Sequence, residues 1–286
     1  MDDIRNKLSA LCRAFLGLCI RVWYSIFGFH KKECLNTQER EVPVIVSLTS
    51  YGRRVTKTLP FALISLLKQR LKPDRIIVWL DEDNWSDENF PKRLQTFRRQ
   101  GVEFKFWEDI RSYKKLIPAI IKYPDAIIIT VDDDLYYHRG LLHDLYNSYL
   151  LHPQKIHAAV THQPLGVAKE DHLQYNLGKK EVSDNSIPEL FPTGGAGCLY
   201  PPGSLHKETI NKEVFMRLCP TADDVWFWVM ARLQSTEHVT VNTKMYLIVD
   251  LLYEFTHKDA ALQHKNVYEN ANDVQLKQVL KHYDLK

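Results

Sequence analysis

The chain has 286 residues, of which 45% are hydrophobic and 26% charged, and its formal net charge at pH 7 is +3. This composition provides a core for one large α/β domain or two smaller ones, and the charge is too small to indicate a nucleic-acid-binding protein. The five cysteines form no Cys-x-x-Cys pair, which favours free thiols in a reducing compartment.

The first predicted element is an apolar helix within residues 8–32. Its apolar residues recur at spacings of three and four, as on one helix face: Leu8, Leu11, Phe15, Leu18, Val22 and Ile26. Arg13 and Arg21 interrupt the run, so no stretch reaches the roughly 20 apolar residues that cross a bilayer. We predict an amphipathic helix lying on a membrane surface, with a helix packed on its own domain or on a partner as the alternative. With a charged linker it forms an N-terminal segment, residues 1–41.

From residue 42 onward, predicted strands and helices alternate. The apolar runs predict strands at 42–48, 75–80, 102–107 and 126–131, and helices at 58–70, 89–101, 113–123 and 141–151. This alternation predicts βαβ units and a parallel sheet covered on both faces. Ligands bind such sheets beyond the carboxyl ends of the strands, and each of these strands is followed there by polar residues.

The second half of the chain is less regular. It contains a predicted strand at 155–162, long Gly- and Pro-containing loops at 163–200, a helix at 223–234, a strand at 243–250 and a C-terminal helix at 272–285. The long loops are a candidate lid over the ligand.

Three consecutive aspartates, Asp132, Asp133 and Asp134, end the fourth predicted strand. Carboxylates this close repel one another unless water or a cation compensates their charge. In an extended chain Asp132 and Asp134 point to one side and Asp133 to the other. Two carboxylates on one side suit Mg²⁺ or Mn²⁺, which commonly shares its site with substrate phosphates. The alternative is a solvated acidic turn.

The stretch "IIITVDDDLYY" is similar to the DXD motif of glycosyltransferases with the GT-A fold, of the bacterial polysaccharide-biosynthesis type. Four further stretches resemble segments of that family in the same order: "PVIVSLTSYGRRVTKTLPFALISLLKQ", "SYKKL", "FPTGGAGCLYPPG" and "TADDVWFWVMA". The resemblance covers residues 43 to about 285. It implies a Rossmann-like α/β sandwich with a mostly parallel central sheet, divided into a nucleotide-binding half (42–135) and an acceptor-binding half (136–286).

The resemblance also implies roles for individual residues on the donor side. Asp134 would be the direct metal ligand, and Asp132 would contact the ribose or assist the metal. A late histidine, His257, would supply a third metal or diphosphate contact. Asp133 would help by hydrogen bonding. The remaining nucleotide-sugar contacts implied by the resemblance are Thr49, Tyr51, Arg53, Asp81 and Lys115, although Asp81 can equally be a strand cap and Lys115 a solvated helix residue.

On the acceptor side, Asp224 aligns with the catalytic base of inverting members, with Asp223 in reserve. Either could instead be an N-terminal helix cap. Gly194 and Gly195 allow a ligand to approach the backbone closely, and Trp226 is the candidate sugar platform, although a helical tryptophan is more often part of the core.

These observations favour a metal-dependent glycosyltransferase that uses a nucleotide-diphospho-sugar donor, Mn²⁺ or Mg²⁺, and a cell-surface or lipid-linked glycan acceptor. We expect it in the cytoplasm, peripheral at the inner face of the cell membrane. One alternative is a sugar nucleotidyltransferase, although the turn "TSYGRR" has a single glycine where that class carries a Gly-rich loop. The other is a non-catalytic carbohydrate-binding protein.

Overall fold

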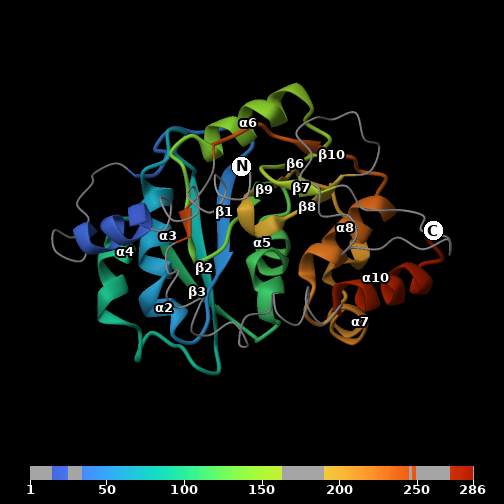
Figure 1. Cartoon of the computed structure of the whole chain (residues 1–286), viewed down its shortest axis with the longest axis horizontal. Coiled ribbons are helices and arrows are strands. Elements are labelled where there is room, and N and C mark those ends of the chain that lie inside the picture. Colours follow the sequence, from blue (N-terminus) through green and yellow to red (C-terminus); the bar gives the residue numbers. More distant parts are fainter. Residues whose placement is uncertain (1–14, 25–33, 163–189, 245–246, 249–270, 286) are drawn as a thin grey trace, which may run out of the picture.

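The computed structural model describes residues 15–24, 34–162, 190–244, 247–248 and 271–285, and Figure 1 shows a central sheet between two layers of helices. The sheet has seven strands in the order β10-β6-β9-β4-β1-β2-β3. Their bounds are β1 Val44–Thr49, β2 Arg75–Asp81, β3 Glu103–Trp107, β4 Ile127–Thr130, β6 Ile156–Ala158, β9 Cys198–Tyr200 and β10 His238–Thr240. Six strands run parallel, and β9 runs antiparallel to both of its neighbours. The predicted α/β sandwich with a mostly parallel sheet is therefore confirmed.

The central strand β1 is buried on both faces, as expected for a parallel sheet covered by helices. Val46 pairs with Ile76 of β2 on one side and with Ile129 of β4 on the other. Because side chains alternate along a strand, Val44, Val46 and Leu48 enter one hydrophobic cluster and Ile45 enters the other.

The helices divide between these two clusters. The first cluster is covered by α2 (Arg54–Lys57), α3 (Leu59–Leu67), α4 (Gln95–Arg99) and α6 (Leu141–Leu151). The second is covered by α5 (Ile117–Lys122), α7 (Lys212–Leu218), α8 (Asp223–Leu233) and α10 (Ala271–His282). Helices from both halves of the chain therefore cover the same sheet.

Several predicted elements differ from the structure. The predicted helices at 89–101 and 113–123 begin as 3₁₀ turns, η1 (Lys92–Leu94) and η2 (Arg111–Lys115). Pro91 directly precedes η1, and Pro118 lies in the first turn of α5, which follows η2. The predicted strand at 155–162 divides into β6 and the short β7 (Thr161–His162). Within the predicted strand over 243–250, Leu247–Ile248 forms β11, which pairs with β5 (Leu135–Tyr136), and residues 245–246 and 249–250 lie outside the described residues.

The interpretation of 163–200 as loops is wrong for its described end. Residues 190–200 contain β8 (Phe191–Pro192), the turn η4 (Gly194–Ala196) and the buried strand β9. β9 was missed because it has only three residues and directly follows a glycine-rich turn. It joins β4 to β6, so this segment completes the sheet.

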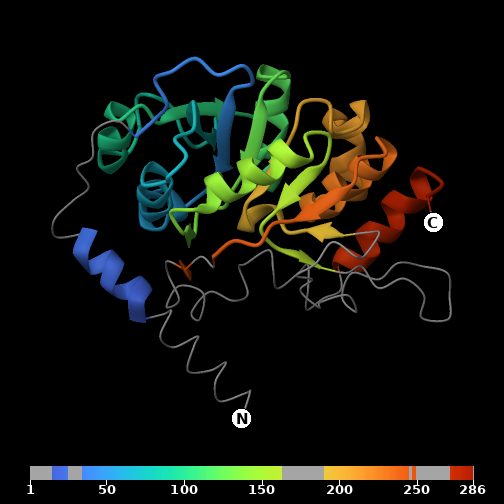
Figure 2. The same cartoon turned by 90° about the horizontal axis from the view of Figure 1, so that it is seen from above.

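A helix over residues 15–24 lies within the predicted N-terminal helix (Figure 2). No helix among the described residues is both long and apolar enough to cross a membrane. The rest of the predicted 8–32 helix lies outside the described residues.

Asp74 fixes the start of the central strand, at the edge of the sheet away from the aspartate run. Its carboxylate accepts hydrogen bonds from the Val44 backbone N–H (2.7 Å), the Arg40 guanidinium (2.7 Å) and the Asn36 amide (2.6 Å). We expect Asp74→Ala to lower the free energy of unfolding by about 1–3 kcal/mol in urea titrations, because three donors lose their acceptor. Asp87→Ala, which removes an exposed ion pair with Arg98, should change it by less than about 0.5 kcal/mol. Equal effects would contradict this assignment.

Candidate active site

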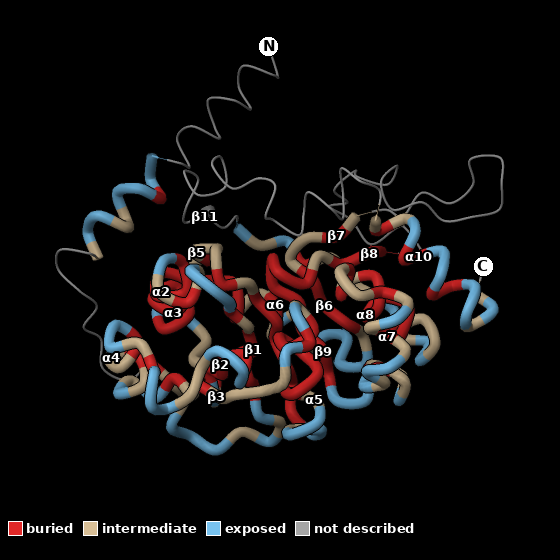
Figure 3. The backbone as a smooth tube through the Cα atoms, turned by 90° about the horizontal axis from the view of Figure 1, so that it is seen from below, coloured by how far each residue is buried: buried red, intermediate tan, exposed pale blue. Residues whose placement is uncertain are grey.

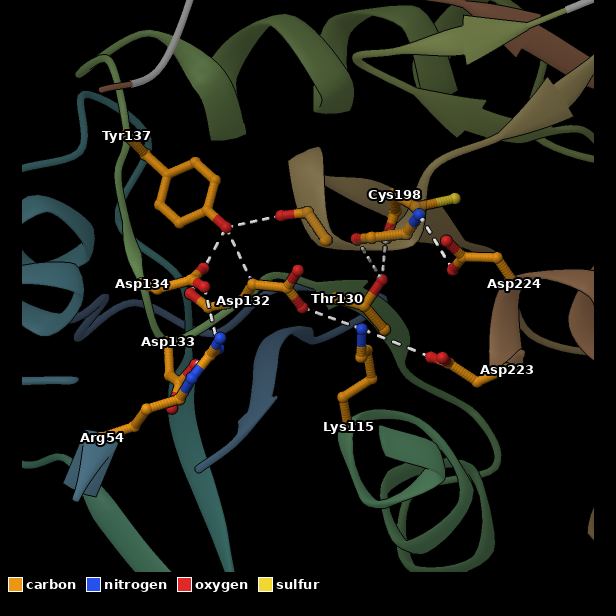
Figure 4. A network of polar contacts seen from close by, with 12 residues as sticks. Arg54, Lys115, Thr130, Asp132, Asp133, Asp134, Tyr137, Cys198, Asp223 and Asp224 are labelled. Atoms are coloured by element: carbon orange, nitrogen blue, oxygen red, sulfur yellow. Dashed lines mark hydrogen bonds and ion pairs between the residues drawn. The ribbon is translucent and has the colours of Figure 1, made fainter. Parts of the chain in front are cut away.

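The polar groups gather at the carboxyl edge of the sheet. The aspartate run follows β4, Ser50 and Arg54 follow β1, and Lys115 ends η2. From the second half of the chain, η4 and the start of α8 bring Gly194, Gly195, Asp223 and Asp224 to the same edge (Figure 4). The expectation that polar residues after the parallel strands lie at one edge of the sheet is met by the residues that follow β1 and β4.

Asp133 and Asp134 share one arginine. The same guanidinium nitrogen of Arg54, Nη1, lies 3.0 Å from Asp133 Oδ1 and 2.8 Å from Asp134 Oδ2. Asp133 also accepts a 2.5 Å hydrogen bond from the Ser50 hydroxyl. Asp133 is buried, whereas Asp134 is partly exposed. The hydrogen bonds of Asp133 are therefore made within the protein, whereas the side chain of Asp134 is still partly accessible to solvent.

Burial alone would lower the pKa of Arg54, but the charges of Asp133 and Asp134 reverse this and raise it. Burial also raises the pKa of Asp133, and Arg54 and Ser50 oppose that shift. The arginine thus stays charged and compensates the part of the aspartate run that is removed from water.

Asp132 pairs with a different cation. Lys115 Nζ lies 2.8 Å from Asp132 Oδ1 and 3.3 Å from Asp223 Oδ2, so it bridges the end of β4 and the start of α8. Burial would lower the pKa of Lys115, and Asp132, Asp223 and Asp224 reverse this shift and raise it well above its usual value. The Asp132 side chain remains 39% exposed. Lys115 is a buried ion-pair partner, so the alternative of a solvated helix residue is wrong, and its contact with a nucleotide stays a prediction.

Gly195 and Tyr137 fix the position of Asp132. A Cβ atom on Gly195 would lie 1.8 Å from Asp132 Oδ2, so only glycine leaves room for this carboxylate. The Asp132 backbone N–H lies 2.7 Å from the Tyr137 hydroxyl, which itself donates a 2.5 Å hydrogen bond to the Gly195 carbonyl. The glycine turn therefore serves close packing against the aspartate run.

Asp224 has the most unusual protonation behaviour at this edge. Its Oδ1 accepts a 3.1 Å hydrogen bond from the Gly194 backbone N–H, and its side chain is partly exposed. Burial and the neighbouring Asp223 raise the pKa of Asp224 to about 7, against the opposing charge of Lys115. It can therefore accept or release a proton near neutral pH.

The edge carries more negative than positive side chains. Two cations, Arg54 and Lys115, face five carboxyl groups: Asp132, Asp133, Asp134, Asp223 and Asp224. A bare diphosphate would be repelled by this surplus, whereas a divalent cation would be attracted. No group of three His, Cys, Asp or Glu side chains able to hold a metal occurs in the described ranges. The prediction that Asp132 and Asp134 point to the same side is wrong, because the chain turns at 133–134 and Asp134 shares Arg54 with Asp133, whereas Asp132 pairs with Lys115. Both are partly exposed carboxylates, the ligand type that a hard cation would take together with water and phosphate oxygens.

Three other residues predicted to contact the nucleotide lie at the end of β1 or directly after it. Thr49 donates a 2.9 Å hydrogen bond to the Trp79 carbonyl. Tyr51 is exposed, with the Arg54 guanidinium 5.4 Å from its ring centre. Arg53 is exposed on the surface.

Asp81 and Trp226 have structural contacts. Asp81 is buried and accepts hydrogen bonds from the Asn84 backbone and amide at 3.0 and 2.5 Å, as a strand cap would. Trp226 is fully buried, and its indole donates to the Thr209 carbonyl at 3.0 Å. The prediction of a sugar platform at Trp226 is therefore corrected to a core position. His257 lies outside the described residues.

Sequence reasoning missed Ser50, Arg54 and Tyr137. Ser50 and Arg54 belong to the quoted "TSYGRR", but the sequence favoured Arg53, and only the start of α2 at Arg54 decides which arginine turns inward. Tyr137 lies three residues after the aspartate run, where the turn at 133–134 returns its hydroxyl to Asp132.

No protein-family description and no curated protein matches this sequence. Among solved structures, residues 1–349 of S. aureus TarS in complex with UDP are 17% identical over 72% of this chain and 59% of that chain, with a TM-score of 0.46. The same TarS segment with UDP-GlcNAc is 16% identical over 72% and 57%, with a TM-score of 0.45. A CMP:2-keto-3-deoxy-manno-octonic acid synthetase complexed with CTP is 11% identical over 77% of this chain and 98% of that chain, with a TM-score of 0.46. At this similarity the comparisons identify no function, and the proposal below rests on the side chains of this chain.

The raised pKa of Asp224 should be measurable as a pH-dependent stability. Because the folded state holds this proton up to about pH 7 and the ordinary value is 3.8, stability should fall as pH rises between those values. We expect Asp224→Asn to be more stable than the parent at pH 8 by about 1–2 kcal/mol, less than the full shift because the group is partly exposed. The difference should shrink toward pH 4 in urea titrations. A difference that does not change with pH would contradict the raised pKa.

The contact between Gly195 and Asp132 gives a second test. Gly195→Ala should lower the free energy of unfolding by about 1–3 kcal/mol, because the new methyl group displaces the Asp132 carboxylate. Combining Gly195→Ala with Asp132→Ala should cost less than the sum of the two single variants, because the shorter side chain leaves room for the methyl group. Additive effects would contradict the contact.

Proposed function

We propose that this protein is a glycosyltransferase that moves a sugar from a nucleotide-diphospho-sugar to an acceptor hydroxyl. The observation that carries this proposal is Asp224, a partly exposed carboxyl group with a pKa of about 7 at the edge that holds the aspartate run. A base with that pKa beside an acidic, oxygen-rich site matches the two requirements of the reaction, which are activation of a hydroxyl and neutralisation of a departing diphosphate.

On the donor side, Asp134 and Asp132 would hold Mg²⁺ or Mn²⁺, which when bound supplies a Lewis acid for the charge on the diphosphate. Lys115 keeps Asp132 in position through its 2.8 Å ion pair. Arg54 holds Asp133 and Asp134, and its planar guanidinium has the geometry to bind phosphate oxygens as well. These residues orient the donor and stabilise the leaving group.

On the acceptor side, Asp224 in its ionised form takes the proton of the acceptor hydroxyl. The acceptor oxygen forms a bond to the anomeric carbon, the bond from that carbon to the diphosphate oxygen breaks, and its electron pair stays with the nucleoside diphosphate. The Gly194 N–H orients the Asp224 carboxylate through its 3.1 Å hydrogen bond. This single displacement would invert the configuration of the sugar.

The turn after β1 favours a transferase over a sugar nucleotidyltransferase. Ser50 and Arg54 in that turn hold Asp133, and the turn contains one glycine, Gly52, in place of a Gly-rich phosphate loop. A carbohydrate-binding protein without catalysis would gain nothing from a carboxyl group poised near pH 7. We propose a cell-surface or lipid-linked glycan as the acceptor.

The proposal predicts metal-dependent nucleotide binding. Calorimetric titration with UDP, GDP, CDP and ADP should give binding of one nucleotide with Mn²⁺ or Mg²⁺ that is weakened at least tenfold by EDTA and by Asp134→Asn. Asp87→Asn is the control, because Asp87 is an exposed acid that pairs with Arg98 and is not one of the proposed site residues. No binding of any nucleotide diphosphate with either metal would sink the proposal.

The role of Asp224 predicts a different pattern. With the donor identified, Asp224→Asn should retain nucleotide binding and lose about 10²–10⁴-fold in kcat. In the parent, kcat/KM should rise with pH through about 7 and then level off, since the base must be ionised. Release of pyrophosphate from a nucleoside triphosphate and a sugar phosphate would instead identify a nucleotidyltransferase.

A further inference from the structure

The outward side of the N-terminal helix, residues 15–24, is entirely apolar. Six consecutive positions around the helix are exposed and cover an arc of about 160° at 3.6 residues per turn: Leu18, Val22, Phe15, Cys19, Trp23 and Leu16. Phe15 is 68% exposed and Trp23 is 59% exposed. A helix on a water-exposed surface normally turns its polar face outward, whereas this helix turns its apolar face outward.

The opposite side of the helix contacts the body of the protein. Gly17 is buried, the Arg21 guanidinium lies 5.6 Å from the Phe61 ring centre, and the Tyr24 hydroxyl accepts a 2.8 Å hydrogen bond from Lys68 Nζ. The helix therefore packs on its own domain, as the alternative prediction has it, and it does so through its polar side. The exposed apolar side faces away from the domain.

The helix is joined to the edge of the sheet that holds the candidate site. Lys68 Nζ also lies 3.4 Å from the hydroxyl of Tyr136 in β5, and Tyr136 follows Asp134 by two residues. Figure 3 shows the helix on the same side of the molecule as β5, β7 and β8. The apolar arc and the aspartate run therefore belong to one side of the protein.

Positive charges lie beside the apolar arc. Arg93 also approaches the Phe61 ring, at 5.5 Å, so two guanidinium groups share this ring. Lys68, directly after α3, contacts Tyr24 of the N-terminal helix. The pKa of Arg93 is lowered, first by burial and then by the charge of Arg21. Cations next to an apolar helix face suit a surface that is apolar inside and negatively charged outside.

We propose that residues 15–24 dock this protein onto an anionic lipid surface, with Leu16, Leu18, Val22 and Trp23 entering the boundary between headgroups and acyl chains. Arg21, Lys68 and Arg93 then lie near the anionic headgroups. The contact from Lys68 to Tyr136 keeps the carboxyl edge of the sheet toward that surface. This docking does not depend on the proposed transferase activity, so each can fail without the other.

The test is sedimentation of the full chain with vesicles. We expect binding to vesicles of phosphatidylcholine with 30% phosphatidylglycerol, about tenfold weaker binding to phosphatidylcholine alone, and weakening by 0.5 M salt. Leu18→Glu combined with Val22→Glu should reduce binding at least tenfold. Val274→Glu is the matched control, because Val274 of α10 is 55% exposed and Val22 is 50% exposed. Thermal unfolding of each variant checks that it folds.

Trp23 provides a readout of position. Its emission should shift to shorter wavelength with anionic vesicles and be quenched by lipids brominated on the acyl chain, and Trp23→Phe should remove the shift while the protein still sediments. Vesicle binding unaffected by the Glu substitutions, or absent altogether, would overturn the proposal. So would a lipid-independent dimer that Leu18→Glu with Val22→Glu dissociates, since the arc would then be an interface between copies.

Discussion

The surplus of negative charge at the end of β4 is the constraint on which the arrangement of this edge depends. The aspartate run is compensated from two other parts of the chain, Asp133 and Asp134 by the turn after β1 that carries Ser50 and Arg54, and Asp132 by Lys115. Because a buried charge without a partner is costly, these contacts fix the turn after β1 and the end of η2 against the end of β4. Lys115 extends the network to Asp223, so the second half of the chain is held by the same charges.

Adjacent carboxyl groups at the start of α8 acquire different properties from their surroundings. Asp223 is buried and lies 3.3 Å from Lys115, whereas Asp224 is partly exposed and bound by the Gly194 N–H. A carboxyl group whose surroundings raise its pKa toward neutrality is typical of sites that transfer protons. The pKa of Asp224 near 7 depends on Asp223, so the buried acid contributes to the behaviour of the exposed one.

Sequence reasoning predicted most elements of the sheet because strands such as 75–80 and helices such as 141–151 carry strong apolar patterns. It also placed Asp132 and Asp134 at the carboxyl ends of the parallel strands, while Asp224 was named from the resemblance of "TADDVWFWVMA" to a family motif. It failed where orientation decides the outcome. Arg53 and Arg54 are chemically identical neighbours, and only the backbone of α2 turns Arg54 inward. Trp226 was assigned to a ligand because a sequence does not show which face of α8 is buried.

The antiparallel strand β9 also determines when this sheet can be completed. Ile129 of β4 pairs with Leu199, far along the chain, and β6 reaches β4 only through β9. During synthesis one edge of β4 therefore stays unpaired until residues near 200 have left the ribosome, and open strand edges are where chains associate wrongly. The aspartate run directly follows this unpaired strand, so its clustered charges hinder such pairing between nascent chains until β9 covers the edge of β4.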